Sequence, residues 1–288
     1  MPTANLPPLI PLPNGKAGIK KELFILPSVL CFDSGGFSHD FIEVYGKRTG
    51  IAVAMEDPAL LRVFRDANLQ SEAYRLCVTT SGIQIEAADE RGLCWALATL
   101  AALTEEKSVQ CCEIEDAPRF AYRGFMMDSA RHFFPMDTIK TMIELMSMVK
   151  INAFHWHLTD DQGWRVESKR FPALHAQNII ADEYYTQNEI REVVEFARLR
   201  GMEIIPEIDL PGHATAILAA FPKLSCSEEQ VRVESSPGIR RVILCPGKEA
   251  VFELLFPLLE EIAGLFPSQY IHLGGDEAPK EEWEKCPH

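Results

Sequence analysis

The residues best suited to chemistry lie in four short polar clusters in the second half of the chain. Each cluster lies at the end of a short apolar run and combines carboxylates with histidine, arginine or glycine. The clusters are Asp128-Ser129-Ala130-Arg131-His132, His155-Trp156-His157-Leu158-Thr159-Asp160-Asp161-Gln162-Gly163-Trp164, Glu207-Ile208-Asp209-Leu210-Pro211-Gly212-His213 and His272-Leu273-Gly274-Gly275-Asp276-Glu277. Carboxylates and imidazoles exchange protons, and an arginine donates paired hydrogen bonds. Together the clusters predict a site for acid–base chemistry on a polar ligand.

Each cluster taken alone also has a structural explanation. Asp128 or Asp137 could cap a helix, and Arg131 could form an ion pair with Asp160 or Asp161. His155 and His157 lie two residues apart on one face of a strand, where both could be hydrogen-bonded core residues. Four clusters would need four independent explanations of this kind, so their conjunction favours a shared functional site.

Alternating strand and helix patterns position the four clusters. The predicted strands are Tyr122–Met127, Ala153–His157, Glu203–Ile208 and Tyr270–Leu273, and the helices between them cover Asp137–Val149, the run after the capping box Thr186–Glu189, and Val251–Ile262. Successive βα units predict a parallel sheet covered by helices. An open doubly wound sheet gathers its polar groups at one switch point, whereas a barrel collects them after every strand. Polar clusters after all four strands therefore favour a barrel.

The first part of the chain has a different pattern of apolar and polar residues. Strands are predicted at Phe41–Tyr45, Ile51–Met55, Tyr74–Thr79 and Gly82–Glu86, followed by one amphipathic helix over Glu90–Leu103. The turn at Glu115-Asp116-Ala117-Pro118 marks the predicted boundary. Residues 1–118 are therefore predicted to form a small α+β domain.

Composition limits the partners and the compartment. Against 28 Lys and Arg stand 42 Asp and Glu, a net charge of −14, which argues against nucleic acid and anionic membranes as partners. The N-terminal sequence lacks the basic and apolar regions of a signal peptide, and no apolar run reaches the ~18–20 residues of a membrane span. None of the 8 cysteines forms a C-x-x-C pair, and several lie in apolar stretches. We therefore expect a cytoplasmic protein.

A metal site is the alternative explanation of the histidines. His155-x-His157 is similar to the first ligand pair of the metal-dependent amidohydrolases, with His213, His272 and Asp276 as further candidate ligands. In that family the pair belongs to the first strand, whereas here it lies on the second. The intervening tryptophan and the following Asp-Asp pair are more typical of a carbohydrate pocket. We therefore expect no metal and no other cofactor.

Four motifs resemble the family 20 glycoside hydrolases, the β-N-acetylhexosaminidases. They are Arg123–Phe133, Phe154–Gln162, Pro206–His213 and His272–Glu277, and the resemblance covers about residues 119–288. Residues 1–118 resemble, more weakly, the α+β domain that precedes the barrel in this family. The resemblance implies an α/β protein: an N-terminal α+β domain over 1–118, then the first half, about four βα units, of a (β/α)8 TIM barrel over 119–288.

The resemblance also implies a reaction and its residues. The family removes terminal β-linked N-acetylglucosamine or N-acetylgalactosamine with retention, using the substrate's own acetamido oxygen as nucleophile. Glu277 corresponds to the general acid and base, and Asp276 to the residue that orients the acetamide. Arg131, Asp160 and His213 are assigned to substrate binding, the last two also as a relay behind the acid. The residues expected to surround them are His157, Asp209 and Trp164.

The resemblance stops after the Asp-Glu motif. In the family, four more strands follow and carry the Trp and Tyr residues that wall the acetamide pocket, whereas this sequence ends at His288. We therefore expect weak or no activity from the chain, and self-association through exposed sheet edges. A non-catalytic glycan-binding module derived from such an enzyme is the alternative function.

Overall fold

The computed structural model describes residues 9–236, 238 and 240–288 and divides into two compact units. Unit 1 contains the described residues up to Arg123 together with Thr141–Asn152 and Phe196–Met202. Unit 2 contains Gly124–Lys140, Ala153–Glu195 and the described residues from Glu203 to His288. The boundary predicted after residue 118 stays a prediction.

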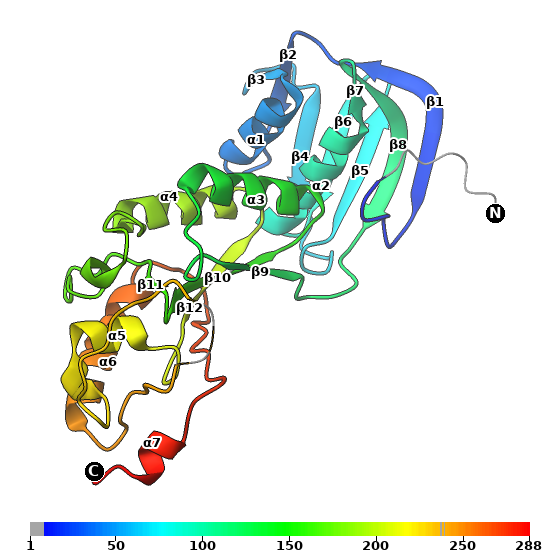
Figure 1. Ribbon diagram of the computed structural model, residues 1–288. Coiled ribbons are helices and arrows are strands. Elements are labelled where there is room, and N and C mark those ends of the chain that lie inside the picture. The colour runs from blue at the N-terminus through cyan, green and yellow to red at the C-terminus, as the bar shows by residue number, and fades with distance from the viewer. Residues whose placement is uncertain (1–8, 237, 239) are drawn as a thin grey trace. The chain divides into compact units, whose positions relative to one another are not determined.

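Unit 1 is a twisted sheet with two helices on one face (Figure 1). Its strand order is β1-β8-β5-β6-β4-β2-β3, with the short β7 paired to β8. The elements are β1 (Ala17–Ile25), β2 (Val29–Asp33), α1 (Asp40–Thr49), β3 (Ala52–Ala54), β4 (Leu61–Arg65), β5 (Tyr74–Thr79), β6 (Gly82–Ala87), α2 (Glu90–Leu103), β7 (Thr104–Glu105) and β8 (Ser108–Asp116). The predicted bounds of β5 and α2 are confirmed.

The strand predicted over Phe41–Tyr45 is wrong, because these residues form part of α1. Phe41, Ile42 and Tyr45 are all buried, which is the spacing of one helical face. Acidic residues in the first turn, basic residues in the last, and Gly50 at φ 69° after the helix support the same conformation. A window of five residues is too short to separate this pattern from strand alternation.

Unit 2 begins as a parallel sheet whose central strand is β10 (Ala153–Asp160). β9 (Gly124–Asp128) and β12 (Glu203–Ile208) each pair with it in parallel, and the two-residue β11 (Gly163–Trp164) turns back antiparallel to its end. The helices of this part of the chain are α3 (Met136–Met148), α4 (Gln187–Arg198), α5 (Thr215–Ala220), α6 (Glu249–Ala263) and α7 (Glu281–Glu284), with 3-10 turns at His175–Gln177 and Pro222–Leu224. The residues of α3 from Thr141 onward and of α4 from Phe196 onward belong to unit 1. Strand–helix alternation around parallel strands is the arrangement of the first units of a (β/α)8 barrel.

The capping box predicted before α4 is confirmed. The backbone N–H of Thr186 donates to Glu189 Oε2 at 2.8 Å, and the backbone N–H of Glu189 donates to Thr186 Oγ1 at 3.2 Å. These reciprocal bonds satisfy donors that the first helical turn leaves free. After the helix, Gly201 adopts φ 75°, a conformation that glycine accepts without strain.

The fourth predicted strand, Tyr270–Leu273, is wrong as a strand. Its one bridge is an isolated parallel pairing of His272 with Glu207. The backbone bonds to the neighbouring chain are His272 N–H to Pro206 O at 2.9 Å, Ile208 N–H to His272 O at 3.0 Å and Leu210 N–H to Leu273 O at 3.0 Å. Gly274 and Gly275 then turn the chain with positive φ. The segment therefore lies beside β12 as the fourth element of the sheet, but its pairing is too short to form a ladder.

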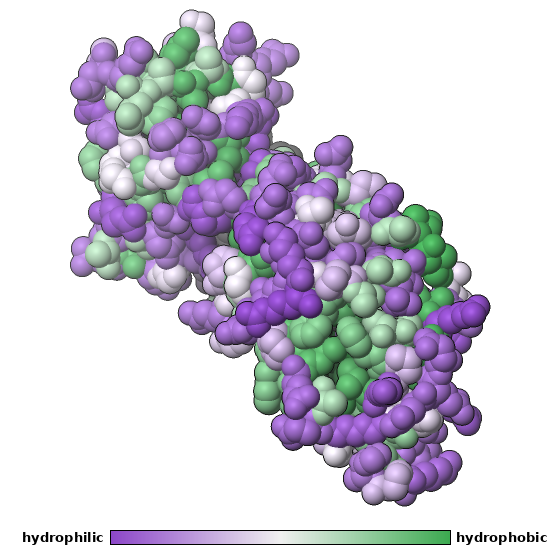
Figure 2. Space-filling model, turned by 90° about the vertical axis from the view of Figure 1, so that its left-hand side faces the viewer, coloured by the Kyte–Doolittle hydropathy of each residue, from purple (hydrophilic) through white to green (hydrophobic). Residues whose placement is uncertain are grey.

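Apolar side chains remain exposed at the edges of this sheet. Phe125 and Met126 on β9, and Tyr270 and Leu273 beside β12, are exposed, and apolar patches interrupt the hydrophilic surface in Figure 2. Unpaired strand edges with apolar side chains favour association, so self-association stays a prediction. In the part of the chain that the structure describes, no helix is both long and apolar enough to cross a membrane.

Candidate active site

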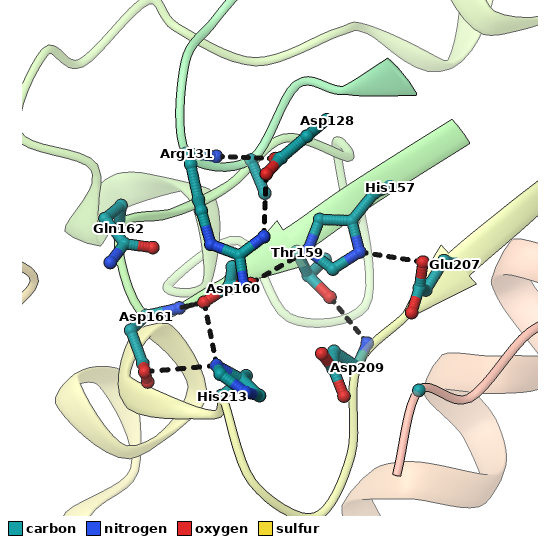
Figure 3. Close-up of polar contacts among 12 residues, drawn as sticks. Asp128, Arg131, His157, Thr159, Asp160, Asp161, Gln162, Glu207, Asp209 and His213 are labelled. Atoms are coloured by element: carbon teal, nitrogen blue, oxygen red, sulfur yellow. Dashed lines mark hydrogen bonds and ion pairs between the residues drawn. The ribbon is translucent and has the colours of Figure 1, made fainter. Parts of the chain in front are cut away.

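The strand register of unit 2 brings three polar residues to one level. His157 on β10 lies beside Asp128 on β9 and beside Glu207 on β12. Asp160 ends β10, and Asp209 directly follows β12. Because the three strands are parallel, their carboxyl ends form one edge, and this edge carries the polar cluster shown in Figure 3.

Arg131 is held by two carboxylates at this edge. Its Nη1 donates to Asp128 Oδ2 at 2.7 Å, its backbone N–H donates to Asp128 Oδ1 at 2.9 Å, and its Nη2 lies 2.8 Å from Asp160 Oδ2 (Figure 3). The Arg131 side chain is 45% exposed, whereas that of Asp160 is 1% exposed. The guanidinium therefore reaches from the buried Asp160 and the partly exposed Asp128 to solvent in a fixed orientation, with donors available for a ligand.

Asp160 is the buried centre of the cluster. Its carboxylate contacts His157 Nε2 at 2.9 Å and His213 Nδ1 at 3.1 Å, and it accepts a hydrogen bond from the backbone N–H of Asp161. Burial alone would raise the pKa of Asp160, but these donors and the Arg131 charge lower it below its usual value. Asp160 is therefore an ionised carboxylate that orients three side chains.

His157 lies between two carboxylates. Its Nε2 contacts Asp160 as above, and its Nδ1 lies 2.8 Å from Glu207 Oε2. Burial opposes protonation, yet the two carboxylates raise the pKa of His157 to about 10. His157 is therefore an imidazolium that lies within ion-pair distance of both Asp160 and Glu207.

Sequence reasoning missed Glu207 as a site residue. Its carboxylate contacts three imidazoles: Oε2 lies 2.6 Å from His155 Nε2 and 2.8 Å from His157 Nδ1, and Oε1 lies 3.1 Å from His272 Nδ1. Burial opposes ionisation, but the histidines lower the pKa of Glu207 far below its usual value. The available signal was its position two residues before Asp209. His155, Glu207 and His272 are also close enough to share a metal ion.

His213 connects Asp160 to Glu277. Its Nδ1 faces Asp160, and its Nε2 lies 3.4 Å from Glu277 Oε2. Burial lowers the pKa of His213, but the charge of Asp160 and of three further carboxylates raises it above the usual value. The Glu277 side chain is 48% exposed. In this order of carboxylate, imidazole and carboxylate, the buried Asp160 orients the imidazole that faces the accessible Glu277.

Asp209 supports the turn that carries Asp276 and Glu277. The backbone N–H of Gly275 donates to Asp209 Oδ1 at 3.3 Å, and any side chain at Gly274 would collide with the Asp209 carboxylate. Burial, with help from the charge of Asp276, raises the pKa of Asp209 to about 6. The Gly-Gly pair therefore permits both a left-handed turn and a close approach of the backbone to Asp209.

Trp164 is the one predicted site residue whose polar atoms lie elsewhere. Its indole N–H donates to Val166 O at 2.7 Å, and its backbone N–H donates to Asn178 Oδ1 at 2.8 Å. The side chain is fully buried. In contrast, Asp161 joins the cluster by accepting from Thr215 Oγ1 at 2.6 Å, which fixes the start of α5. The structure thus brings Arg131, Asp160, His213, His157, Asp209 and Glu277 to one edge, where the charge of Asp276 acts on Asp209 and His213. Trp164 lies in the packing of its own loop.

The charge of His157 predicts a pH dependence of stability. Its pKa in the folded protein, about 10, exceeds the ordinary value of 6.5, so protonation favours folding. This stabilisation is complete below about pH 6.5 and is lost as the pH rises toward 10. The urea midpoint of unit 2 should fall over this window, and His157→Gln should flatten the fall. An unchanged slope in the variant would contradict the assignment.

Two family signatures match the chain. The glycosyl hydrolase family 20 catalytic domain matches residues 120–288, and domain 2 of the same family matches residues 33–117. The chain therefore belongs to glycosyl hydrolase family 20, as the four motifs predict. The predicted fold class, an α+β domain followed by part of a TIM barrel, is confirmed by its structural relatives.

Curated relatives of the chain are β-hexosaminidases. The β-hexosaminidase of Porphyromonas gingivalis is 38% identical over 237 residues, which is 76% of this chain and 30% of the relative. That of Akkermansia muciniphila is 37% identical over 235 residues, covering 76% and 48%. The chain thus spans less than half the length of these relatives.

Solved structures have the same fold. The β-N-acetylhexosaminidase of Bacteroides fragilis superimposes with a TM-score of 0.87 at 35% identity, over 97% of this chain and 58% of that one. The exo-β-N-acetylglucosaminidase of Vibrio harveyi, solved with N-acetylglucosamine, gives a TM-score of 0.84 at 33% identity, over 98% and 48%.

Proposed function

We propose that the chain carries the acid–base half of a retaining β-N-acetylhexosaminidase that acts on terminal β-linked N-acetylglucosamine or N-acetylgalactosamine. The observation that carries the proposal is the series of contacts from Asp160 through His213 to Glu277. The guanidinium of Arg131 lies beside this series, in contact with Asp160. The names of the relatives support the same substrate class.

In this reaction Glu277 gives its proton to the leaving oxygen as the glycosidic bond breaks. The substrate's acetamido oxygen forms the new bond to the anomeric carbon, so the protein supplies no nucleophile. Asp276 accepts the acetamide N–H and faces the positive charge that develops on the acetamide. Glu277 then removes a proton from the water that opens the cyclic intermediate, which restores both the acid and the original configuration.

His213 supports Glu277 in its deprotonated form, which is the form that acts as the base. When Glu277 has lost its proton, the imidazole 3.4 Å away stabilises the carboxylate, and Asp160 behind it keeps Nδ1 as a donor. His157, held between Asp160 and Glu207, fixes the Asp160 carboxylate in turn. His157 and Glu207 are therefore positioning residues in this proposal.

Arg131→Lys tests the recognition of the sugar. We expect the KM for an aryl β-N-acetylglucosaminide to rise about 10- to 100-fold with a smaller change in kcat, because one charge-assisted hydrogen bond contributes ~1.5–3 kcal/mol. Lysine keeps the charge but loses the fork held by Asp128 and Asp160. Arg170→Lys, which changes a half-exposed arginine paired with Glu260, is the matched control. Equal effects of the two substitutions would contradict the role of Arg131.

The direct test of the function is hydrolysis of a β-linked N-acetylglucosamine disaccharide, with NMR used to identify the anomer that is released first. Release of the β anomer first supports the proposal, and release of the α anomer first overturns it. Saturable binding without hydrolysis, even at stoichiometric protein, would favour the alternative, a glycan-binding module.

A further inference from the structure

Three thiols from distant parts of the sequence meet in unit 2. Cys226 follows the 3-10 turn Pro222–Leu224, Cys245 precedes α6, and Cys286 follows α7. The three sulfur atoms all lie within 4.8 Å of one another, and those of Cys245 and Cys286 are 3.4 Å apart. Cys245 is buried and the other two are half-buried. The proposed glycosidase chemistry uses none of them.

The backbone around the three thiols is held independently of the sulfur atoms. The backbone N–H of Cys245 donates to Leu224 O at 2.9 Å, and Lys248 Nζ donates to Ser225 O at 2.8 Å, which joins the first two segments. The Trp283 indole donates to Leu244 O at 2.9 Å, which joins the third. The convergence of the thiols is therefore built into the fold of these loops.

Three converging thiolates are the ligand set of a soft metal ion. Zn–S bonds of about 2.3 Å in tetrahedral geometry place sulfur atoms about 3.8 Å apart, close to the spacing here. Cysteine-only sites select Zn²⁺ or Cu⁺ over hard cations. A disulfide would use only two of the three sulfurs and leave the third beside it.

We propose that Cys226, Cys245 and Cys286 bind one thiophilic metal ion, Zn²⁺ or Cu⁺. Its role is structural, because it ties the segment that runs from Glu277 through α7 to Cys286 onto the loops before α6. Three protein ligands leave a fourth position for solvent or another ligand. The inference does not depend on the proposed glycosidase activity.

The experiment is metal titration of the reduced, metal-free 288-residue chain, purified without a histidine tag. With Zn²⁺ against a chromophoric chelator we expect one tight equivalent, and with Co²⁺ a thiolate-to-metal charge-transfer absorption. Cys226→Ser, Cys245→Ser and Cys286→Ser should each weaken binding on the order of 100-fold or more, since even residues behind a metal's ligands cost 10- to 100-fold. Cys77→Ser, on β5 in unit 1, should change nothing. His272→Gln should also leave binding intact, which separates this site from the His155–Glu207–His272 group.

A second measurement, cysteine alkylation, uses only the wild-type chain and does not depend on the folding of a variant. Zn²⁺ should slow alkylation of Cys226, Cys245 and Cys286 in the wild-type chain, followed by mass spectrometry, while the half-buried Cys31 keeps its rate. A parallel titration with Cu⁺ against a competing ligand decides which ion is preferred. The proposal is overturned if the reduced chain binds neither ion, if the cysteine substitutions leave binding unchanged, or if the thiols are found only as a disulfide pair.

Discussion

Glu277→Gln is expected to lower kcat for a β-N-acetylglucosamine disaccharide by about 100- to 10,000-fold, the range of general acid–base catalysis. Glutamine matches the size of the side chain but has no proton to give, and it places no charge opposite His213 Nε2. Because Arg131 can still bind the sugar, KM should change little. The control is Glu284→Gln, which changes an exposed glutamate in the same C-terminal segment.

The leaving group makes this test specific. A dinitrophenyl glycoside releases dinitrophenolate, a stable anion that needs little protonation by an acid. The substitution should therefore slow its bond-breaking step much less than that of the disaccharide. A variant that is merely misfolded would lose activity on both substrates equally. Both substrates are measured in the 288-residue chain and, where the gene continues beyond codon 288, in its full product. Near-wild-type kcat on the disaccharide in Glu277→Gln would show that Glu277 is not the acid.

Glu207→Gln is expected to destabilise unit 2 by about 3–5 kcal/mol, the usual cost of removing one partner from a buried ion pair. Glu207 is the common partner of His155, His157 and His272, and its loss leaves a buried imidazolium with less compensation. Urea unfolding measures the loss. Glu192→Gln removes a glutamate that is 61% exposed and paired with Lys140, so it should cost less than about 1 kcal/mol.

The pKa of His157 separates this charge effect from poor packing. Glu207 is one of the two carboxylates that raise this pKa to about 10. In Glu207→Gln, NMR should therefore find a lower pKa for His157. A stability loss with an unchanged pKa would mean that the substitution damages packing and that Glu207 does not hold the imidazolium.

Local sequence was sufficient for elements whose signals lie within a few residues. The bounds of β5, α2 and β12 follow from hydrophobic periodicity, and the start of α4 follows from the Thr186 capping box. The strand prediction for Phe41–Tyr45 failed because five residues are too few to distinguish the helical period from the strand period. The strand prediction for Tyr270–Leu273 failed because a strand also requires a neighbouring strand to pair with. The four motifs were likewise sufficient for the family, since they depend on residue identity and order.

The state of the site was decided only by tertiary structure. An isolated histidine titrates near 6.5, and His157 departs from this value because carboxylates from its own strand end and from β12 enclose it. The role of Glu207, and the meeting of Cys226, Cys245 and Cys286, likewise depend on segments far apart in sequence. Sequence alone determined which chemical groups this protein carries and which segments of the chain they follow. Charge, proton affinity and shared ligands were settled by the fold, because they depend on burial and on neighbours that only the folded chain supplies.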